Sequence, residues 1–174
     1  MSSPTTAASP KRAVLKGGLI GCGYVAKSHL AAWRLQTLGS LLAVCDLDFE
    51  RARHAADSFG VPRVFSSPEQ MIKECDLDFV EICTRPNSHE SLIQLSAKYQ
   101  LDILCQKPLA PDLATIDRMI AVCQEHGVRC MVHENWRFRP WYVQMGARSE
   151  KVAPWANPFD SAFNPTTFAA LLAA

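Results

Sequence analysis

Short apolar runs alternate with longer amphipathic stretches from Val14 to about Val132. Six runs recur, at residues 19–20, 41–45, 64–65, 79–83, 103–105 and 128–132. Each is too short for a helix and too continuous for a strand with one face in water. Strands of a parallel sheet covered on both faces have this composition, so the runs predict buried parallel strands.

Apolar residues also recur at helical spacing between these runs. The four patterns are Ala26, Leu30 and Trp33; Ala52, Ala55, Ala56 and Phe59; Leu92, Leu95 and Tyr99; and Leu113, Ile116, Met119, Ile120 and Cys123. Asp48 is placed to cap the second helix and Gly60 to end it, Pro86 suits a first turn, and Gly127 closes the fourth helix. Repetition of strand and helix predicts an α/β fold, a doubly wound parallel sheet with right-handed crossovers.

The pattern changes at both ends of the chain. Residues 1–13 are rich in Ser, Thr, Ala and Pro and are expected to form a disordered lead. Residues 14–140 form the predicted doubly wound domain. Residues 141–174 lack a sustained period and contain three prolines, so we expect an atypical, poorly ordered tail with at most one short helix near 168–172.

Composition narrows the classes of partner. The 174 residues are 48% hydrophobic and 20% charged, and 18 Lys+Arg against 17 Asp+Glu leave a net charge of +1. A nucleic-acid binder usually carries a basic excess, so we expect no nucleic-acid partner. No apolar run approaches the roughly 18 residues of a membrane span, and the N-terminus does not resemble a secretory signal, so we expect no membrane partner.

The seven cysteines are odd in number and include no Cys-x-x-Cys pair. This spacing supports neither a zinc ribbon nor a redox pair, and no metal site is predicted. Cys45, Cys83, Cys105 and Cys130 lie in apolar runs and are interpreted as small buried hydrophobes of a reducing compartment, hence a cytoplasmic protein. A cysteine nucleophile remains a minor alternative.

A glycine-rich turn follows the first predicted strand. Residues 21–26, Gly-Cys-Gly-Tyr-Val-Ala, match G-x-G-x-x-G/A between a strand and a helix. Gly21 permits the tight turn, Gly23 lets the backbone approach a pyrophosphate, and Ala26 allows close helix packing. The backbone around Tyr24 and Val25 would offer free N–H groups to the anion at the start of the helix.

Asp46 closes the second strand 25 residues after Gly21. A carboxylate there can accept hydrogen bonds from the adenosine ribose and would repel a 2′-phosphate, which favours NAD over NADP. Arg51 and Arg53 could still serve a 2′-phosphate, so NADP stays possible. The alternative is that Asp46 or Asp48 merely caps the next helix.

Three further segments carry distinctive motifs. They are residues 83–89 (CTRPNSH), 106–110 (QKPLA) and 134–140 (ENWRFRP). Together with residues 21–29, they resemble the Gfo/Idh/MocA oxidoreductases, with four motifs in the same order over about residues 14–142. The resemblance implies that residues 14–140 are a Rossmann domain that binds NAD or NADP, followed in the family by an α/β substrate domain. It also implies reversible hydride transfer at a CH–OH carbon of a small-molecule sugar or polyol.

The resemblance also implies roles for particular residues. Those expected to contact the cofactor are Thr84, Pro86, Asn87, His89, Gln106 and Lys107, with Trp136 and Arg137 on the stretch that leaves the nucleotide domain. His89 is more simply a residue that orients backbone, and His133 a strand-end residue.

Lys107 is the catalytic candidate. Removing a hydride from an alcohol carbon requires the hydroxyl proton to leave, and a lysine at the carboxyl end of a parallel strand faces the ligand crevice. Burial beside a cationic nicotinamide favours the uncharged amine that can accept this proton. The competing interpretation is an ordinary solvated lysine, but the position after the fifth run and before Pro108 favours function.

The chain departs from the family in two respects. Gln106 replaces the usual glutamate, which changes the local charge by one unit. Family members are about twice this long, so the second domain is expected to be largely missing, with its sugar contacts and the surface for homo-oligomers. Two further hypotheses therefore stand beside a sugar or polyol dehydrogenase: a non-catalytic dinucleotide-binding module and an inactive truncated fragment.

Overall fold

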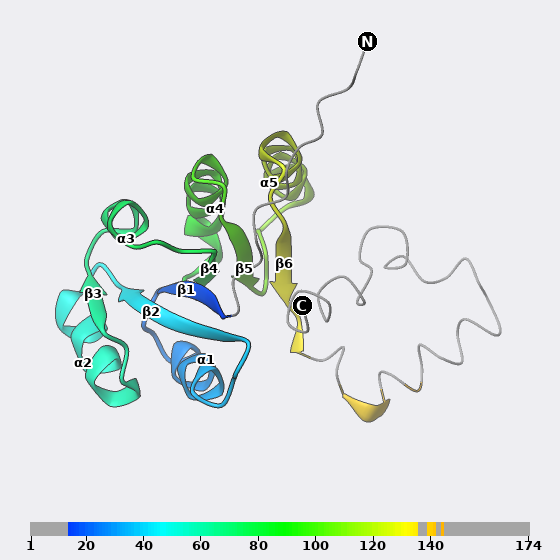
Figure 1. Cartoon of the computed structure of the whole chain (residues 1–174). Coiled ribbons are helices and arrows are strands. Elements are labelled where there is room, and N and C mark those ends of the chain that lie inside the picture. The colour runs from blue at the N-terminus through cyan, green and yellow to red at the C-terminus, as the bar shows by residue number, and fades with distance from the viewer. Residues whose placement is uncertain (1–13, 136–138, 142–143, 145–174) are drawn as a thin grey trace, which may run out of the picture.

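The computed structural model describes residues 14–135, 139–141 and 144 (Figure 1). Six parallel strands form one sheet in the order β3-β2-β1-β4-β5-β6. The strands are β1 (Leu15–Ile20), β2 (Gly39–Cys45), β3 (Arg63–Phe65), β4 (Phe79–Ile82), β5 (Asp102–Gln106) and β6 (Cys130–His133). All six apolar runs lie on strands or at their ends, which confirms the predicted doubly wound sheet.

Helices cover both faces of the sheet (Figure 1). Two of them, α1 (Ala26–Trp33) and α2 (Phe49–Phe59), pack on one face. The opposite face carries α3 (Pro68–Glu74), α4 (His89–Lys98), which the short 3-10 helix η1 (Pro86–Ser88) precedes, and α5 (Leu113–His126). The sheet is therefore the middle layer of three, as parallel strands with crossover helices require.

The predicted helix ends are confirmed where capping chemistry was visible. The Asp48 carboxylate accepts a hydrogen bond from the backbone N–H of Arg51 at 3.2 Å, and Gly60 ends α2 at a φ of 72°. Gly127 ends α5 in the same left-handed conformation, with φ 67°. These residues fix the start of α2 and the ends of α2 and α5 where the sequence predicted them.

Helix α3 was not predicted. Ser67 caps it by accepting a hydrogen bond from the backbone N–H of Gln70, and Pro68 occupies its first turn. Ser-Pro before Met71 and Ile72, both buried, is a recognisable start signal, but seven residues are too few to show a helical stripe.

The apolar stripe that predicted α5 is only partly buried in the structure. Met119 and Cys123 are buried, but Leu113 is 77% exposed and Ile120 47% exposed. Leu113 and Ile120 are seven residues apart and so share one edge of the helix, about 130° around the helix axis from the buried Thr115 and Met119. Helical spacing predicted the stripe but not which edge of it contacts the core.

All seven cysteines are free thiols, six of them buried. Burial confirms the interpretation of Cys45, Cys83 and Cys105 as small core residues, whereas Cys130 is half-buried on the edge strand β6. Burial raises the pKa of the Cys22 thiol to about 12, with the Asp46 carboxylate adding to the rise and Arg51 opposing it. Such a thiol is a poor nucleophile at neutral pH.

None of the helices in the described ranges is long and apolar enough to cross a bilayer.

Candidate functional site: a crevice at the carboxyl edge of the sheet

The predicted site residues gather at one edge of the sheet. Because all six strands are parallel, the segments that follow them lie at the same edge. β1 pairs with β2 on one side and with β4 on the other, and this reversal of strand order creates the crevice in which doubly wound folds bind ligands. The glycine-rich turn leaves β1 at that point.

Gly21 is required by the shape of this turn. Its φ is +95°, and its backbone N–H donates to the Cys45 carbonyl at 2.7 Å. A Cβ added there would lie 2.8 Å from Thr84 Cγ2 and 2.9 Å from the carbonyl carbon of Cys83. Only glycine therefore fits where the turn passes the end of β4.

Gly23 has the opposite surroundings. A Cβ added there would have no heavy atom of the described residues within 4 Å, apart from its chain neighbours. Its φ is not in the left-handed region. Open space rather than backbone strain distinguishes this position, as expected where a ligand approaches the backbone.

The first turn of α1 is free to bind an anion. In the described structure no side chain caps it at Val25, and it contains no acidic residue. Tyr24, just before this turn, is 91% exposed. Uncapped N–H groups and the positive end of the helix dipole together suit a phosphate, so the residues present fit the pyrophosphate of a dinucleotide.

Asp46 joins the end of β2 to the glycine-rich turn. Its Oδ2 accepts the backbone N–H of Cys22 at 2.8 Å, and its Oδ1 accepts the N–H of Asp48 at 3.0 Å. The Arg51 guanidinium lies 3.3 Å from Oδ1. The carboxylate thus faces the crevice and is held in place, and it is Asp48 rather than Asp46 that caps α2. A carboxylate has about four acceptor positions, so one remains for a hydroxyl.

The segment that follows β4, through η1 to the first residue of α4, contains Thr84, Pro86, Asn87 and His89. Ser88 Oγ donates to Thr84 Oγ1 at 2.8 Å, and Asn87 is exposed in η1. The His89 ring is fully buried, with Nδ1 2.9 Å from the Leu109 carbonyl and Nε2 3.1 Å from the Thr84 carbonyl. His89 therefore connects the loop after β4 to the loop after β5 and can act on a ligand only through backbone.

Lys107 follows β5 and is exposed at the same edge. Its backbone N–H donates to the side-chain Oε1 of Gln106 at 2.9 Å, and the Lys107–Pro108 peptide is cis. The side chain is thus available to a bound molecule. Trp136 and Arg137 lie outside the described residues.

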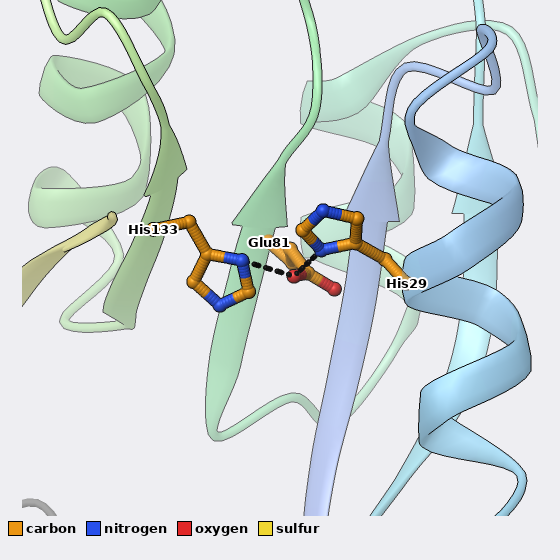
Figure 2. A group of neighbouring side chains, drawn as sticks. All are labelled: His29, Glu81 and His133. Carbon is orange, nitrogen blue, oxygen red and sulfur yellow. Dashed lines mark hydrogen bonds and ion pairs between the residues drawn. The ribbon is translucent and has the colours of Figure 1, made fainter. Parts of the chain in front are cut away.

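A buried carboxylate beside this loop was missed by sequence reasoning. Glu81, on β4, is 1% exposed. Figure 2 shows His29 from α1 and His133 from the end of β6 both turned toward it, with their Nδ1 atoms 2.6 Å and 3.5 Å from Oε1. Trp33 Nε1 donates to Oε2 at 2.6 Å. A glutamate within an apolar run was the available signal, because a buried carboxylate needs partners.

Burial lowers the pKa of His133 below its ordinary value. The Glu81 carboxylate opposes this shift and His29 adds to it. The two imidazole rings stack with centroids 4.7 Å apart and planes inclined by 25°. His133 lies at the end of β6, which confirms its interpretation as a strand-end residue.

An open glycine turn at the switch point of a doubly wound sheet, with an acidic residue after the second strand, is the arrangement of dinucleotide-binding Rossmann domains. The sequence profile described as an oxidoreductase family with an NAD-binding Rossmann fold matches residues 15–134. The chain therefore belongs to the Gfo/Idh/MocA oxidoreductase family, which confirms the resemblance drawn from its four motifs.

Several relatives are similar to this chain over its nucleotide-binding part. A D-apiose dehydrogenase of Paraburkholderia graminis is 43% identical over 131 residues, which cover 75% of this chain and 35% of that protein. A myo-inositol 2-dehydrogenase of Thermotoga maritima is 30% identical, covering 70% and 36%. The crystal structure of an oxidoreductase from Agrobacterium radiobacter in complex with NAD+, L-tartaric acid and magnesium has a TM-score of 0.73 and 33% identity. That match covers 78% of this chain and 40% of the other. The chain thus spans well under half the length of these relatives.

Proposed function

We propose that this chain binds NAD in the crevice between β1, β2 and β4. The observation that carries the proposal is the Asp46 carboxylate, which contacts the N–H of Cys22 within the glycine-rich turn and so stands beside the open space at Gly23. The pyrophosphate would lie on the first turn of α1 and the adenosine ribose against Asp46. Thr84, Pro86 and Asn87 would line the other side of the crevice.

We further propose that the family's reaction, hydride transfer between the nicotinamide and a CH–OH carbon of a sugar or polyol, is the chemistry for which this site is built. NAD supplies the hydride acceptor or donor when bound. Lys107 is the residue of this chain that would take the hydroxyl proton, because it is exposed at the edge where the loops after β4 and β5 meet. The named functions of the dehydrogenase relatives support a sugar or polyol substrate, and the seven free thiols support a cytoplasmic location.

Calorimetric titration of the chain with NAD and with NADP tests the binding step. Saturable binding of NAD that Gly23→Ala weakens supports the proposal, and no heat of binding from folded protein contradicts it. Absorbance of the reduced nicotinamide, followed with D-apiose, myo-inositol and other polyols, then tests turnover. Lys107→Met is the matched variant, because it keeps the length of the side chain and removes the amine.

A non-catalytic dinucleotide-binding module is the second candidate. It is favoured by the 35% and 36% of the two dehydrogenase relatives that the chain spans. Saturable NAD binding without turnover of any tested substrate would select it.

A further inference from the structure

The hydrogen bonds around Gln106 determine which nitrogen of His29 carries a proton. Gln106 Oε1 accepts the backbone N–H of Lys107 at 2.9 Å, and Gln106 Nε2 lies 3.0 Å from Nε2 of His29. An amide nitrogen only donates, so His29 Nε2 is the acceptor and carries no proton. The ring proton is then on Nδ1, which donates to Glu81 Oε1 at 2.6 Å.

Glu81 is a fixed anchor for this chain of bonds. It is 1% exposed in the middle of β4, and Trp33 Nε1 donates to its second oxygen at 2.6 Å. The His133 ring stacks on His29 and restricts its rotation (Figure 2). The N–H groups of Trp33, His29, Gln106 and Lys107 thus each have one acceptor along this chain of hydrogen bonds.

We propose that Glu81, His29 and Gln106 form a hydrogen-bonded chain that positions the Lys107 peptide, and that the amide at position 106 keeps the proton of His29 on Nδ1. All three are positioning residues, acting on Lys107 through its backbone. The importance of Lys107 in this inference rests on the proposed function. The order of the hydrogen bonds from Glu81 through His29 to Gln106 does not depend on it.

Charge explains why an amide suits position 106 here. A glutamate at this position would offer only acceptors to His29 Nε2, so the contact would need a second ring proton. The ring would then be a cation between two carboxylates. With glutamine the same contact forms without that proton.

The atoms of His29, Glu81 and His133 that could bind a metal lie within 4.8 Å of one another. A metal site is therefore an alternative to the hydrogen-bonded chain. One observation favours the hydrogen-bonded chain. His29 Nδ1 already carries the proton that it donates to Glu81, and a metal at that nitrogen would have to displace this proton. We therefore assign these contacts to hydrogen bonding.

The first test measures the tautomer directly. Long-range 1H–15N spectra of the whole chain at neutral pH, with His29 assigned by its loss in His29→Asn, report which ring nitrogens are protonated. We expect a proton on Nδ1 and none on Nε2. A proton on Nε2, or on both nitrogens, would overturn the inference. This measurement needs no cofactor, so its outcome is independent of whether the chain binds NAD.

The second test uses Gln106→Glu, with Gln94→Glu on the exposed side of α4 as a control for the added charge. At about pH 8 we expect Gln106→Glu to lower the midpoint of thermal unfolding by about 4 °C. At about pH 6 the added ring proton restores the contact, and the deficit should fall to less than about half. The deficit of the control should not shrink in this way.

Other charged groups near His29 do not change this comparison. Glu81 from β4 and His133 from β6 face His29, Lys107 follows Gln106 in the chain, and all three are present in the parent chain and in both variants. A Gln106→Glu deficit that is the same at both pH values would contradict the inference. If Gln106→Glu does not fold, the tautomer of His29 measured in the parent chain still tests the inference.

A third measurement concerns Lys107 itself. The backbone 1H–15N resonance of Lys107 should shift in Gln106→Glu at about pH 8 and return toward its original position at about pH 6. If the substitution only disturbed the local structure, the Lys107 resonance would not return toward its original position when the pH is lowered. NAD titration of the same samples keeps the two proposals separate: a correct tautomer without NAD binding rejects the proposed function alone, and NAD binding with the wrong tautomer rejects only this inference.

Discussion

The Asp46 carboxylate accepts a hydrogen bond from the backbone N–H of Cys22 at 2.8 Å, and so ties the end of β2 to the glycine-rich turn after β1. Asp46→Ala removes this tie and the proposed ribose acceptor together. Because hydrogen bonds to charged groups contribute about 1.5–3 kcal/mol, NAD affinity should fall at least about tenfold in calorimetric titration.

Asp48→Ala is the control for this change. Asp48 caps α2 and pairs with the same Arg51, so its loss should cost about 1 kcal/mol of unfolding free energy and leave NAD affinity within about twofold. An equal loss of affinity in both variants would show that Asp46 acts only through the stability of the loop.

Arg51 should decide between the two nicotinamide cofactors. Its guanidinium now lies 3.3 Å from Asp46 Oδ1 and 3.1 Å from Asp48 Oδ2. Asp46→Ser removes the charge that repels a 2′-phosphate and releases Arg51 from one of its two carboxylate partners, so the ratio of NADP to NAD affinity should rise by about tenfold. Adding Arg51→Gln should reverse the gain; a ratio that does not respond to Arg51 would contradict this role.

Gly21 and Gly23 should separate stability from binding. Gly21→Ala places a Cβ 2.8 Å from Thr84 Cγ2 at a φ of +95°, so it should lower the unfolding free energy by about 1–3 kcal/mol. Gly23→Ala places its methyl group in open space and should unfold like the parent chain, yet bind NAD at least about tenfold more weakly. Urea unfolding and titration of both variants check the pair, and stable Gly21→Ala protein would count against the geometry of the turn.

The sheet and four of its helices could be predicted from the sequence because their signals are local. Runs such as residues 41–45 and 79–83 are apolar on both faces, and Asp48 and Gly60 mark helix ends within a few residues of the chain. Helix α3 was missed because a seven-residue helix has no periodicity to measure. Leu113 showed the limit of periodicity, since spacing does not determine which edge of a stripe contacts the core.

The site could be predicted only in part, for a related reason. The glycine-rich turn and Asp46 follow strands whose ends must meet, so the topology brings them together. The contacts of His29 with Glu81 and with Gln106 join residues 52 and 77 positions apart, and only the fold places them side by side. In the same way, the sequence could not show that the His89 ring bonds to the Leu109 carbonyl.

His89 should be needed for stability. Its buried ring lies within hydrogen-bond distance of the Thr84 and Leu109 carbonyls and donates to at least one of them, so His89→Leu removes a buried donor. The cost should be about 1–3 kcal/mol, which lowers the midpoint of thermal unfolding by about 4–10 °C. His54→Leu, on the exposed side of α2, is the control and should shift the midpoint by less than about 2 °C. Equal shifts in the two variants would contradict this role for His89.

Acid should destabilise the fold partly through His133. Burial holds the pKa of His133 below its ordinary value in the folded chain, so the unfolded chain takes up the proton first as pH falls. The contribution of His133 to the free energy of unfolding is therefore complete above about pH 6.5, the ordinary pKa of histidine. It is lost as pH falls from there toward the pKa of His133 in the folded chain. Urea unfolding at a series of pH values should show a shallower acid dependence for His133→Asn than for the parent chain. The Glu81 carboxylate opposes the shift, so Glu81→Gln should steepen the acid dependence instead. Identical slopes in the parent chain and His133→Asn would show that the ring titrates alike in the folded and unfolded states.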